Sequence, residues 1–288
     1  MSWIEWNPDP VAFTLPVMNR PVLWYGILFA FGFVVGYFIL IQIVSQRLQN
    51  SRHIDRKTSQ PLALAFVDRF TWIIVGGIVI GARLGHVFFY DWPLYQNNPT
   101  EIFMVWKGGL ASHGAVVGGL FAVFIYQRLM KKKYPEYNFI NLLDDIVIPT
   151  AFAAFCIRIG NFMNQEILGV PTQLPWGVIF MRPADGGDIV PRHPVQLYEA
   201  FAYFLVFIFL LSLWKVKKGQ LRPGLLSGLF FILVFGTRFF IEFLKVSQSY
   251  VINETYLSTG QLLSIPVILG GFLLIFLQLS GRSGKIKA

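Results

Sequence analysis

Long apolar stretches separated by short polar ones dominate the chain. Seven of these stretches are long enough to cross a hydrocarbon core about 30 Å thick as helices that rise about 1.5 Å per residue. We expect these helices near residues 22–44, 62–81, 110–126, 139–157, 195–214, 225–244 and 262–279. Glycines interrupt the third stretch, and Asp144-Asp145 interrupts the fourth. The pattern predicts an all-α integral membrane protein with seven transmembrane helices in a single membrane domain, residues 1–288.

The composition agrees with this interpretation. Hydrophobic residues make up 55% of the chain and charged residues only 14%, whereas a soluble domain carries about 25% charged residues. Aromatic residues make up 17%, which suits lipid-facing helices with interfacial belts. The net charge of +9 is therefore expected to reflect membrane topology, and we expect no nucleic-acid partner.

Basic residues gather in alternate connections between the predicted helices. One set of connections, together with the C-terminal tail, contains Arg47, Arg52, Arg56, Lys57, Arg128, Lys131, Lys132, Lys133, Lys215, Lys217, Lys218, Arg222, Arg282, Lys285 and Lys287. The other set contains Arg20, Lys107, Arg182, Arg192 and Lys245. Because cytoplasmic loops carry the excess of Lys and Arg, we expect the N-terminus outside and the C-terminus in the cytoplasm.

Several chemical features are missing from the sequence. Glu5 and Asp9 precede the first basic residue, so we expect no cleavable signal peptide. Cys156 is the only cysteine, which excludes a disulfide framework, and its apolar neighbours favour a packing role. The four histidines show no ligand spacing, so we expect no metal and no cofactor.

The longest connection on the expected outer side is 160–194. It is rich in proline, contains Gly186-Gly187, and has an apolar island at 176–181. Connections of this length in a compact protein are usually functional or disordered. We expect a small extracytoplasmic head, formed by this insertion between the fourth and fifth helices.

The stretch 158–169, RIGNFMNQEILG, covers the start of this insertion and directly follows an uncharged apolar run. A charged residue at the centre of a span costs about 2.5–3.5 kcal/mol, so such residues usually mark functional sites. A guanidinium in an apolar setting favours a bidentate carboxylate or phosphate. Two interpretations follow: an internal Arg158–Glu166 pair that joins two segments, or an anion-binding site.

Two more ionisable residues lie among small residues at predicted helix ends. Arg83 lies in GARLGH, residues 81–86, where small neighbours allow close helix approach. It is either a functional cation or an arginine that snorkels to the interface. His113 lies in GGLASHGA, residues 108–115. It is either a general base or a structural group.

The sixth and fifth predicted helices add further candidates. Arg238 and Glu242 are four residues apart on one helical face, with Lys245 beyond them. They either pair within the helix, or Arg238 joins Arg158 in a phosphate site. The stretch 191–199, PRHPVQLYE, opens the fifth helix and contains His193.

These motifs resemble the bacterial prolipoprotein diacylglyceryl transferase family, and the resemblance covers nearly the whole chain. The matching stretches are LWYG at 23–26, GARLG at 81–85, SHG at 112–114, RIGNFMNQEILG at 158–169, RHPVQLYE at 192–199, RFFIEF at 238–243 and GQLLSIP at 260–266. The family fold implied is a seven-helix body with a periplasmic head formed by the long loop.

The resemblance also implies an activity. Such enzymes transfer the diacylglyceryl group of phosphatidylglycerol to the lipobox cysteine thiol of a preprolipoprotein. A thioether forms and glycerol phosphate leaves, in the first step of bacterial lipoprotein maturation. The implied partners are phosphatidylglycerol, preprolipoprotein signal peptides and membrane lipids. We expect a monomer in the bacterial plasma (inner) membrane, with its site facing the outer leaflet or periplasm.

The resemblance assigns roles to residues by position. Arg158 binds the phosphatidylglycerol head group, Arg238 is a second essential arginine, and His113 is a candidate base for the thiol. Tyr25 is a further residue expected in catalysis. The other residues expected in substrate binding are Asn161, Asn164, Glu166, Gly169, Arg83, His193 and Glu242. Val234 stands where the family usually has tyrosine. This departure keeps a catalytically impaired lipid-binding paralogue as one alternative, and the intramembrane arginines keep a lipid or anion transporter as another.

Overall fold

The computed structural model describes residues 3–16, 19–246 and 257–280. Within these ranges seven helices are long and apolar enough to cross a membrane, as predicted. The spans are Trp24–Arg52, Arg56–Phe89, His113–Met130, Phe139–Met163, Val195–Val216, Leu225–Leu244 and Thr259–Gln278. The first two extend well beyond the apolar stretches that predicted them. The second starts at Arg56 because the Asp55 side chain caps it, accepting the Thr58 N–H at 2.9 Å.

The chain forms two compact units. The larger unit contains residues 1–40 and 144–288, and the smaller unit contains residues 41–143. The helices are α1 (Trp24–Arg52), α2 (Arg56–Phe89), α3 (Trp92–Asn97), α4 (Ser112–Met130), α5 (Phe139–Met163), α6 (Val195–Val216), α7 (Leu225–Ile241) and α8 (Thr259–Ser280). Short 3-10 helices are η1 (Pro99–Phe103), η2 (Val105–Lys107) and η3 (Glu242–Leu244). Short strands are β1 (Ile4–Trp6), β2 (Val11–Leu15), β3 (Arg20–Leu23), β4 (Val178–Phe180) and β5 (Pro191–Arg192).

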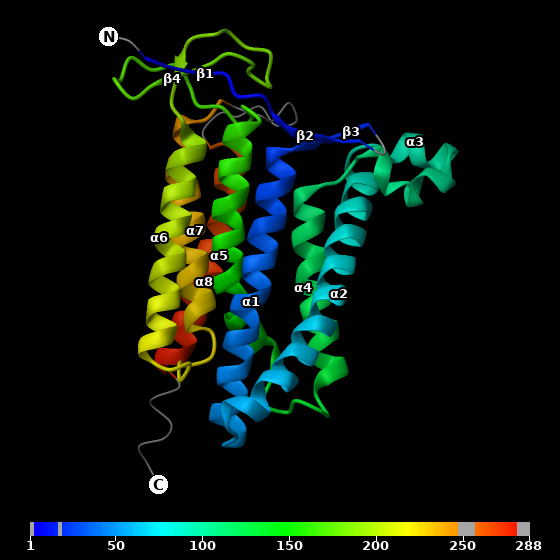
Figure 1. Ribbon diagram of the computed structural model, residues 1–288, viewed down its shortest axis with the longest axis vertical. Helices are drawn as coiled ribbons and strands as arrows, with labels where there is room; N and C mark the ends of the chain where they lie inside the picture. Colours follow the sequence, from blue (N-terminus) through cyan, green and yellow to red (C-terminus); the bar gives the residue numbers. More distant parts are fainter. Residues whose placement is uncertain (1–2, 17–18, 247–256, 281–288) are drawn as a thin grey trace. The chain divides into compact units, whose positions relative to one another are not determined.

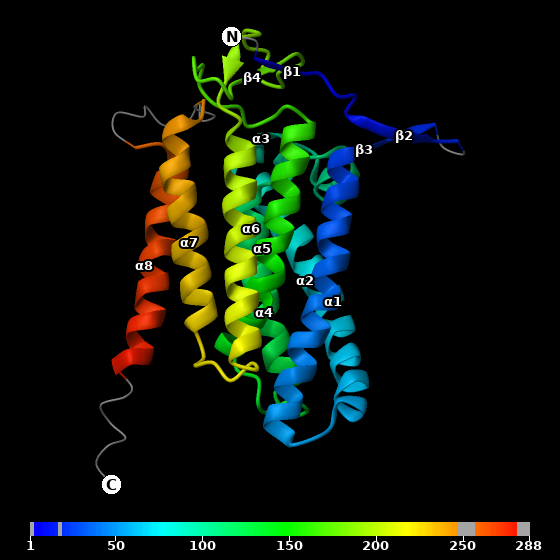
Figure 2. The same ribbon diagram turned by 60° about the vertical axis from the view of Figure 1, so that its left-hand side comes forward.

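In the larger unit, α7 and α8 lie side by side along their length (Figure 1 and Figure 2). Gly228 and Gly271 meet at this contact, where a Cβ added to either would lie 2.9 Å from the carbonyl oxygen of the other. Cys156 is buried and packs against Gly32 of α1, which agrees with the packing role predicted for it. Small residues therefore let helix backbones approach closely.

Asp144, which interrupts the apolar pattern of α5, caps the start of α7. Its buried carboxylate accepts the N–H groups of Gly224 at 2.5 Å and Ser227 at 2.8 Å, and the Ser227 hydroxyl at 2.6 Å. The first N–H groups of a helix have no partner within it and carry a partial positive charge, so a carboxylate there is stabilising. Asp144, which interrupts the predicted fourth span, thus joins α5 to the start of α7.

The segment between α5 and α6 is an ordered head built on strands, which the hydrophobic pattern did not predict. β4 pairs antiparallel with β5 and parallel with β1 from the start of the chain. Phe162, Leu168, Val178 and Phe180 form the buried cluster of this head, with Trp6 packed against it. The expectation of an insertion at 160–194 needs two corrections: α5 continues to Met163, and the N-terminal segment supplies a strand.

In the smaller unit, α2 and α4 cross at glycines spaced four apart. Gly77, Gly81 and Gly85 of α2 face Gly114 and Gly118 of α4. A Cβ on Gly81 would lie 2.7 Å from the Cα of Gly118, so the two backbones are in direct contact. This is the small-xxx-small contact of membrane helices, in which van der Waals packing supplies the association energy.

We predict that Gly118→Ala weakens this helix pair. The added methyl group would overlap the carbonyl oxygen of Gly77, and backbone cannot move aside as a flexible side chain does. Overpacking of this kind costs about 1–3 kcal/mol. The free energy of unfolding in detergent micelles should fall by that amount.

The matched control is Gly119→Ala on the same helix, where the new methyl group would make an ordinary 3.4 Å contact with Ile78. Equal stabilities of the two variants would contradict the close backbone contact.

Candidate active site

The sequence motifs of the larger unit meet where several of its helices end. The C-terminal ends of α5 and α7 and the N-terminal ends of α1, α6 and α8 lie at the same end of the unit, next to the head (Figure 1). Backbone groups left unpaired at helix ends are available for bonding. Polar and charged side chains from separate motifs can therefore gather there.

A buried carboxylate, that of Glu199 on α6, lies at the centre of this region. Its side chain is 0% exposed. Glu199 Oε2 lies 2.9 Å from Arg158 Nε, and Oε1 lies 2.9 Å from Lys245 Nζ. The Tyr203 hydroxyl, one turn along α6, donates to Oε1 at 3.3 Å. Glu199 thus carries the negative charge that two nearly buried cations, 11% and 6% exposed, require.

A second chain of contacts runs from Arg158 toward the head. Arg158 donates from Nη1 to Asn161 Oδ1 at 2.9 Å, one turn along α5. Asn161 Nδ2 then donates to Glu166 Oε1 at 2.7 Å, and Asn164 Nδ2 approaches the same oxygen at 3.4 Å. Arg158 reaches Glu166 through Asn161, and no direct Arg158–Glu166 ion pair forms within the described residues.

The backbone on both sides of Glu166 is strained. Gln165 and Ile167 have positive φ values of 53° and 58°, a conformation that is unusual for any side chain and an outlier for a β-branched one. The surrounding contacts hold it: the buried Gln165 side chain accepts the N–H of Arg182 at 2.7 Å, and Gln196 Nε2 donates to the Glu166 carbonyl oxygen at 2.8 Å. Strained backbone held in this way clusters at functional sites.

Tyr25, in the first turn of α1, lies beside the same residues. Its ring packs onto Gly160, where an added Cβ would come within 2.7 Å of the ring. Its hydroxyl interacts electrostatically with Glu166 and Arg158. The structure therefore brings Tyr25, Arg158, Asn161, Asn164 and Glu166 together.

Arg238 and Glu242 lie at the end of α7 but do not pair with each other. Glu242 Oε2 lies 3.0 Å from Lys245 Nζ, and its carboxylate packs against Gly260. Arg238 is half-buried and interacts electrostatically with the Tyr203 hydroxyl. Its guanidinium has no hydrogen bond or ion pair to any other residue within the described ranges. Of the two alternatives for Arg238, the pair with Glu242 does not form, and Glu242 pairs with Lys245 instead.

Gly169 and His193 belong to segments next to the head that are joined by backbone hydrogen bonds. Gly169 pairs with Lys245, Val170 donates to Leu244 O at 2.9 Å, and His193 donates to Val170 O at 3.1 Å. An added Cβ on Gly169 would overlap the His193 backbone, so only glycine fits there. The His193 ring bonds Tyr198 Oη at 3.2 Å, and Tyr198 also accepts from Trp176.

The two remaining predicted residues lie in the smaller unit. His113 is exposed in the first turn of α4, where its ring contacts the rings of Phe89 and Tyr90 at 5.8 and 5.7 Å between centroids. Arg83 is buried, and its guanidinium donates to the backbone carbonyl oxygens of Glu101, Ile102, Gly108 and Gly109 at 2.5–3.1 Å.

Sequence reasoning missed Glu199 and Lys245 as members of the site. Both were visible as charges inside motif stretches, Glu199 in RHPVQLYE and Lys245 beyond Glu242. Local spacing pairs a residue only with its neighbours along one helix. The contacts of Glu199 with α5 and with the segment after η3 depend on how helices pack, which spacing does not give.

The arrangement is suited to binding an anion at a helix end. Arg158 and Lys245 share Glu199, and Lys245 also contacts Glu242, whereas Arg238 has no such partner within the described residues. A guanidinium held in an apolar setting with free donors matches a phosphate. Nowhere in the described ranges do three or more His, Cys, Asp or Glu side chains group in a way that could hold a metal ion.

Comparisons with known proteins agree on one family. A family model described as prolipoprotein diacylglyceryl transferase matches residues 10–277. Relatives named phosphatidylglycerol–prolipoprotein diacylglyceryl transferase include one from Protochlamydia amoebophila, 39% identical over 96% of this chain and 95% of its own length. Others are from Tolumonas auensis, 41% identical over 95% and 96%, and from Chloroherpeton thalassium, 42% identical over 96% and 94%.

We predict that Glu199→Gln destabilises the larger unit. The substitution keeps the side-chain volume but leaves Arg158 and Lys245 buried without their shared carboxylate. Removing one partner of a buried ion pair costs about 3–5 kcal/mol. A denaturant titration in mixed micelles should show this loss in the free energy of unfolding.

Two further variants test the electrostatic cause. Glu5→Gln, at an exposed position in β1, should change nothing. Adding Lys245→Gln to Glu199→Gln should recover part of the loss, because the excess positive charge is removed. A double variant less stable than the sum of its parts would refute this account.

Proposed function

The chain belongs to the prolipoprotein diacylglyceryl transferase family, and we propose that it transfers the diacylglyceryl group of phosphatidylglycerol to the cysteine thiol of prolipoproteins. It is a transferase of lipoprotein biosynthesis. The seven apolar helices make it a multi-pass membrane protein. The observation that carries the proposal is the pair of arginines, Arg158 and Arg238, at the apolar helix ends of the larger unit.

The proposed reaction is a displacement at carbon. The thiolate sulfur of the acceptor cysteine attacks the glycerol carbon that bears the phosphodiester oxygen. A carbon–sulfur bond forms, the carbon–oxygen bond breaks, and its electron pair leaves on glycerol phosphate. The proton of the thiol is taken up by a base. Negative charge therefore grows on the phosphate as the bond breaks, and cations placed there stabilise the transition state.

Arg158 and Arg238 are suited to that charge in different ways. Arg158 is fixed by Glu199 and Asn161, so it can position a head group with little loss of entropy. Arg238 has no fixed partner within the described residues, so its donors are available for the phosphate. We assign Arg158 to phosphatidylglycerol binding and Arg238 to stabilisation of the leaving group.

The remaining site residues support these two. Asn161, Asn164 and Glu166 hold Arg158 in place, and Tyr25 closes the side formed by α1. Gly169, His193 and Glu242 shape the wall between the head and α7. We assign Tyr25 to catalysis and the other residues of this group to substrate binding.

His113 is proposed as the base for the thiol. It is exposed, and it makes ring contacts but no hydrogen bond within the described part of the chain. A neutral imidazole with an available nitrogen can accept a proton. Arg83 is assigned to substrate binding by resemblance, although its donors already bond carbonyl groups.

The location and partners follow from the same proposal. We place the protein as a monomer in the bacterial plasma membrane, with the N-terminus outside and the C-terminus in the cytoplasm. The head then faces outward, and the site receives lipid from the outer leaflet. The acceptors are signal peptides that carry a lipobox cysteine. Because the relatives are named as transferases, a transporter is disfavoured.

We predict that a lipobox peptide incubated with the protein and phosphatidylglycerol gains the mass of one diacylglyceryl group. Val234 should not prevent this, because it is buried on α7 one turn before Arg238 and contributes packing there. Mass spectrometry of the peptide makes the measurement, and a peptide with serine in place of cysteine is the control. Phosphatidylglycerol binding without any mass gain would point to the impaired paralogue, whereas flux of intact lipid would point to a transporter.

We predict that replacing either arginine lowers activity, whereas only the replacement of Arg158 lowers the stability of the protein. Arg158→Ala and Arg238→Ala should each lower turnover by about 100- to 1000-fold, the effect typical of losing one charge-stabilising donor. Arg158→Ala should also lower the unfolding temperature, because it removes one of the two cations that neutralise Glu199. Arg238→Ala should not.

Arg182→Ala, at an exposed position in the head, is the matched control and should retain activity and stability. Full turnover by Arg158→Ala, or a large loss of stability in Arg238→Ala, would overturn these assignments.

A further inference from the structure

The connection between α2 and α4 forms a compact cap on the smaller unit. We define the cap as residues 92–107, which contain α3, η1 and η2. Only Tyr90 and Asp91 separate it from α2, and residues 108–111 separate it from α4. Because α2 and α4 are both membrane-length helices, these short links hold the cap at the level where the two helices end.

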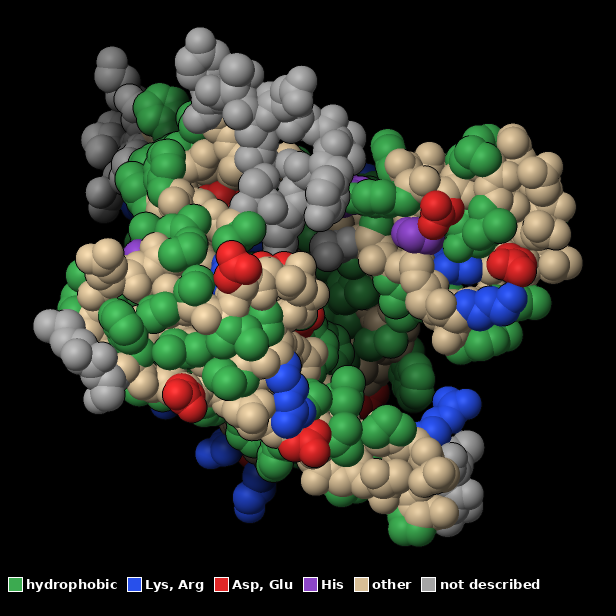
Figure 3. Space-filling view, turned by 90° about the horizontal axis from the view of Figure 1, so that it is seen from above, with side chains coloured by type: hydrophobic (Ala, Val, Ile, Leu, Met, Phe, Trp, Pro, Cys, Tyr) green, Lys and Arg blue, Asp and Glu red, His purple; other side chains and the backbone are tan. Residues whose placement is uncertain are grey.

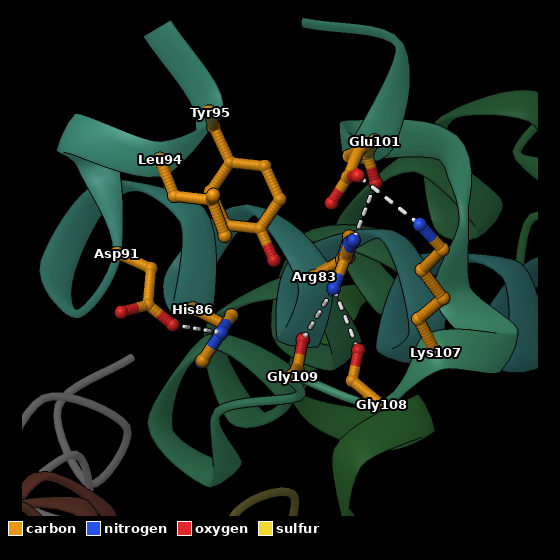
Figure 4. A pocket seen from close by; sticks show the side chains of 9 residues that line it. All are labelled: Arg83, His86, Asp91, Leu94, Tyr95, Glu101, Lys107, Gly108 and Gly109. Atoms are coloured by element: carbon orange, nitrogen blue, oxygen red, sulfur yellow. Dashed lines mark hydrogen bonds and ion pairs between the residues drawn. The ribbon is translucent and has the colours of Figure 1, made fainter. Parts of the chain in front are cut away.

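Arg83 fixes the cap to α2. Its guanidinium donates to carbonyl oxygens at 2.5 Å (Glu101), 2.6 Å (Gly108), 2.9 Å (Ile102) and 3.1 Å (Gly109). It also lies over the ring of Tyr95, 4.9 Å from the centroid. Carbonyl oxygens in irregular backbone need donors when water is scarce. One buried side chain from α2 thus satisfies several of them at once (Figure 4).

The other ionisable side chains around Arg83 contact one another in pairs. His86 Nε2 lies 2.9 Å from Asp91 Oδ2, and Lys107 Nζ lies 3.1 Å from Glu101 Oε1. These residues line a cavity of about 390 Å³ together with Arg83. Since every charge in it has a partner, the cavity offers no unmatched group to an ionic ligand. The contacts around it instead join the cap to α2.

The cap exposes large apolar side chains. Phe103 is 79% exposed and Trp106 is 77% exposed. Trp92, Leu94 and Leu110 add to the same exposed apolar set. In the space-filling view, hydrophobic side chains surround charged and histidine side chains on this part of the molecule (Figure 3). Tryptophan and phenylalanine with a nearby lysine are typical of segments that lie in a membrane–water interface.

This apolar surface continues onto the helices that carry the cap. Phe88 and Phe89 are exposed at the end of α2, and the Phe88 ring stacks on that of Trp92 at 5.5 Å. Val116 and Val117 are exposed near the start of α4. In a multi-pass membrane protein, exposed apolar surface of this kind on a spanning helix contacts lipid. The aromatic set of the cap therefore extends a lipid-contacting surface sideways.

We propose that the cap is an interfacial anchor, with Phe103 and Trp106 inserted among the lipid head groups and upper acyl chains. Besides the substrate role assigned to it by resemblance, Arg83 is then a positioning residue: it holds the irregular backbone so that these rings face the bilayer. The proposal does not depend on the reaction assigned above, because it concerns only the lipid contacts of the smaller unit.

Site-directed spin labelling tests the anchor in the full chain. Cys156 is buried and is the only native cysteine, so Cys156→Ala gives a background for Phe103→Cys and Trp106→Cys. The protein is reconstituted into vesicles of phosphatidylcholine and phosphatidylglycerol. Labels at 103 and 106 should collide several times more often with oxygen than with a water-soluble nickel chelate. A label at Asn98→Cys, in the polar turn between α3 and η1, should show the reverse.

Labels at 103 and 106 that match the label at 98 would overturn the proposal. Spin–spin broadening with loss of access to both reagents would assign the surface to a second copy of the chain instead. A second measurement avoids labels altogether: phosphatidylcholine brominated near the head group should quench tryptophan fluorescence less in Trp106→Phe than in the unaltered protein. Equal quenched fractions would also overturn the proposal.

Discussion

The neutralisation of Glu199 is the constraint on which much of the larger unit depends. A carboxylate with no exposure to solvent cannot stay ionised without nearby cations and donors. Arg158 from α5 and Lys245 from the segment after α7 supply those cations, so three elements are fixed by one group. The orientation of Arg158 then sets Asn161, which in turn sets Glu166. Glu166, Asn161 and Arg158 thus share one connected geometry.

The membrane imposes a related constraint on backbone groups. Carbonyl and N–H groups that leave regular helix geometry must find partners within the protein, because lipid offers none. The structure meets this need with side chains from neighbouring helices. Asp144 accepts the N–H groups at the start of α7, and Arg83 donates to the carbonyl groups of the cap. Asp144 is a charge inside a predicted span and Arg83 is a charge at a predicted helix end, and both bond to backbone groups.

The apolar stretches of the sequence predicted the spans well, because length and apolar content decide whether a helix can cross a bilayer. They also located the motif around Arg158 and Glu166, since isolated charges stand out against an apolar background. They could not show that Arg158 pairs with Glu199, because that choice depends on how α5 and α6 pack. The role of Arg83 was equally hidden: its partners are carbonyl groups in a segment with no periodic pattern.

The strands of the head are the other feature that the local sequence pattern could not predict. β1 is three residues long and pairs in parallel with β4, which lies far away in the sequence. Such pairing is decided by tertiary contacts, here the packing of Trp6 on Phe162 at 4.4 Å between ring centroids. Short strands without alternation give no signal that separates them from loops.

This parallel pairing also sets an order of assembly. β1 is synthesised before α1, α2, α4 and α5, whereas its partner β4 is made only after these four spanning helices. Contacts between distant segments form late, since the chain between them must be ordered first. Trp6 can therefore make its contact only after Phe162 has been synthesised. Its indole N–H donates to the Phe162 carbonyl oxygen at 3.0 Å. The turn that holds Glu166 lies just beyond Phe162, so the framework of the site is completed late in biogenesis.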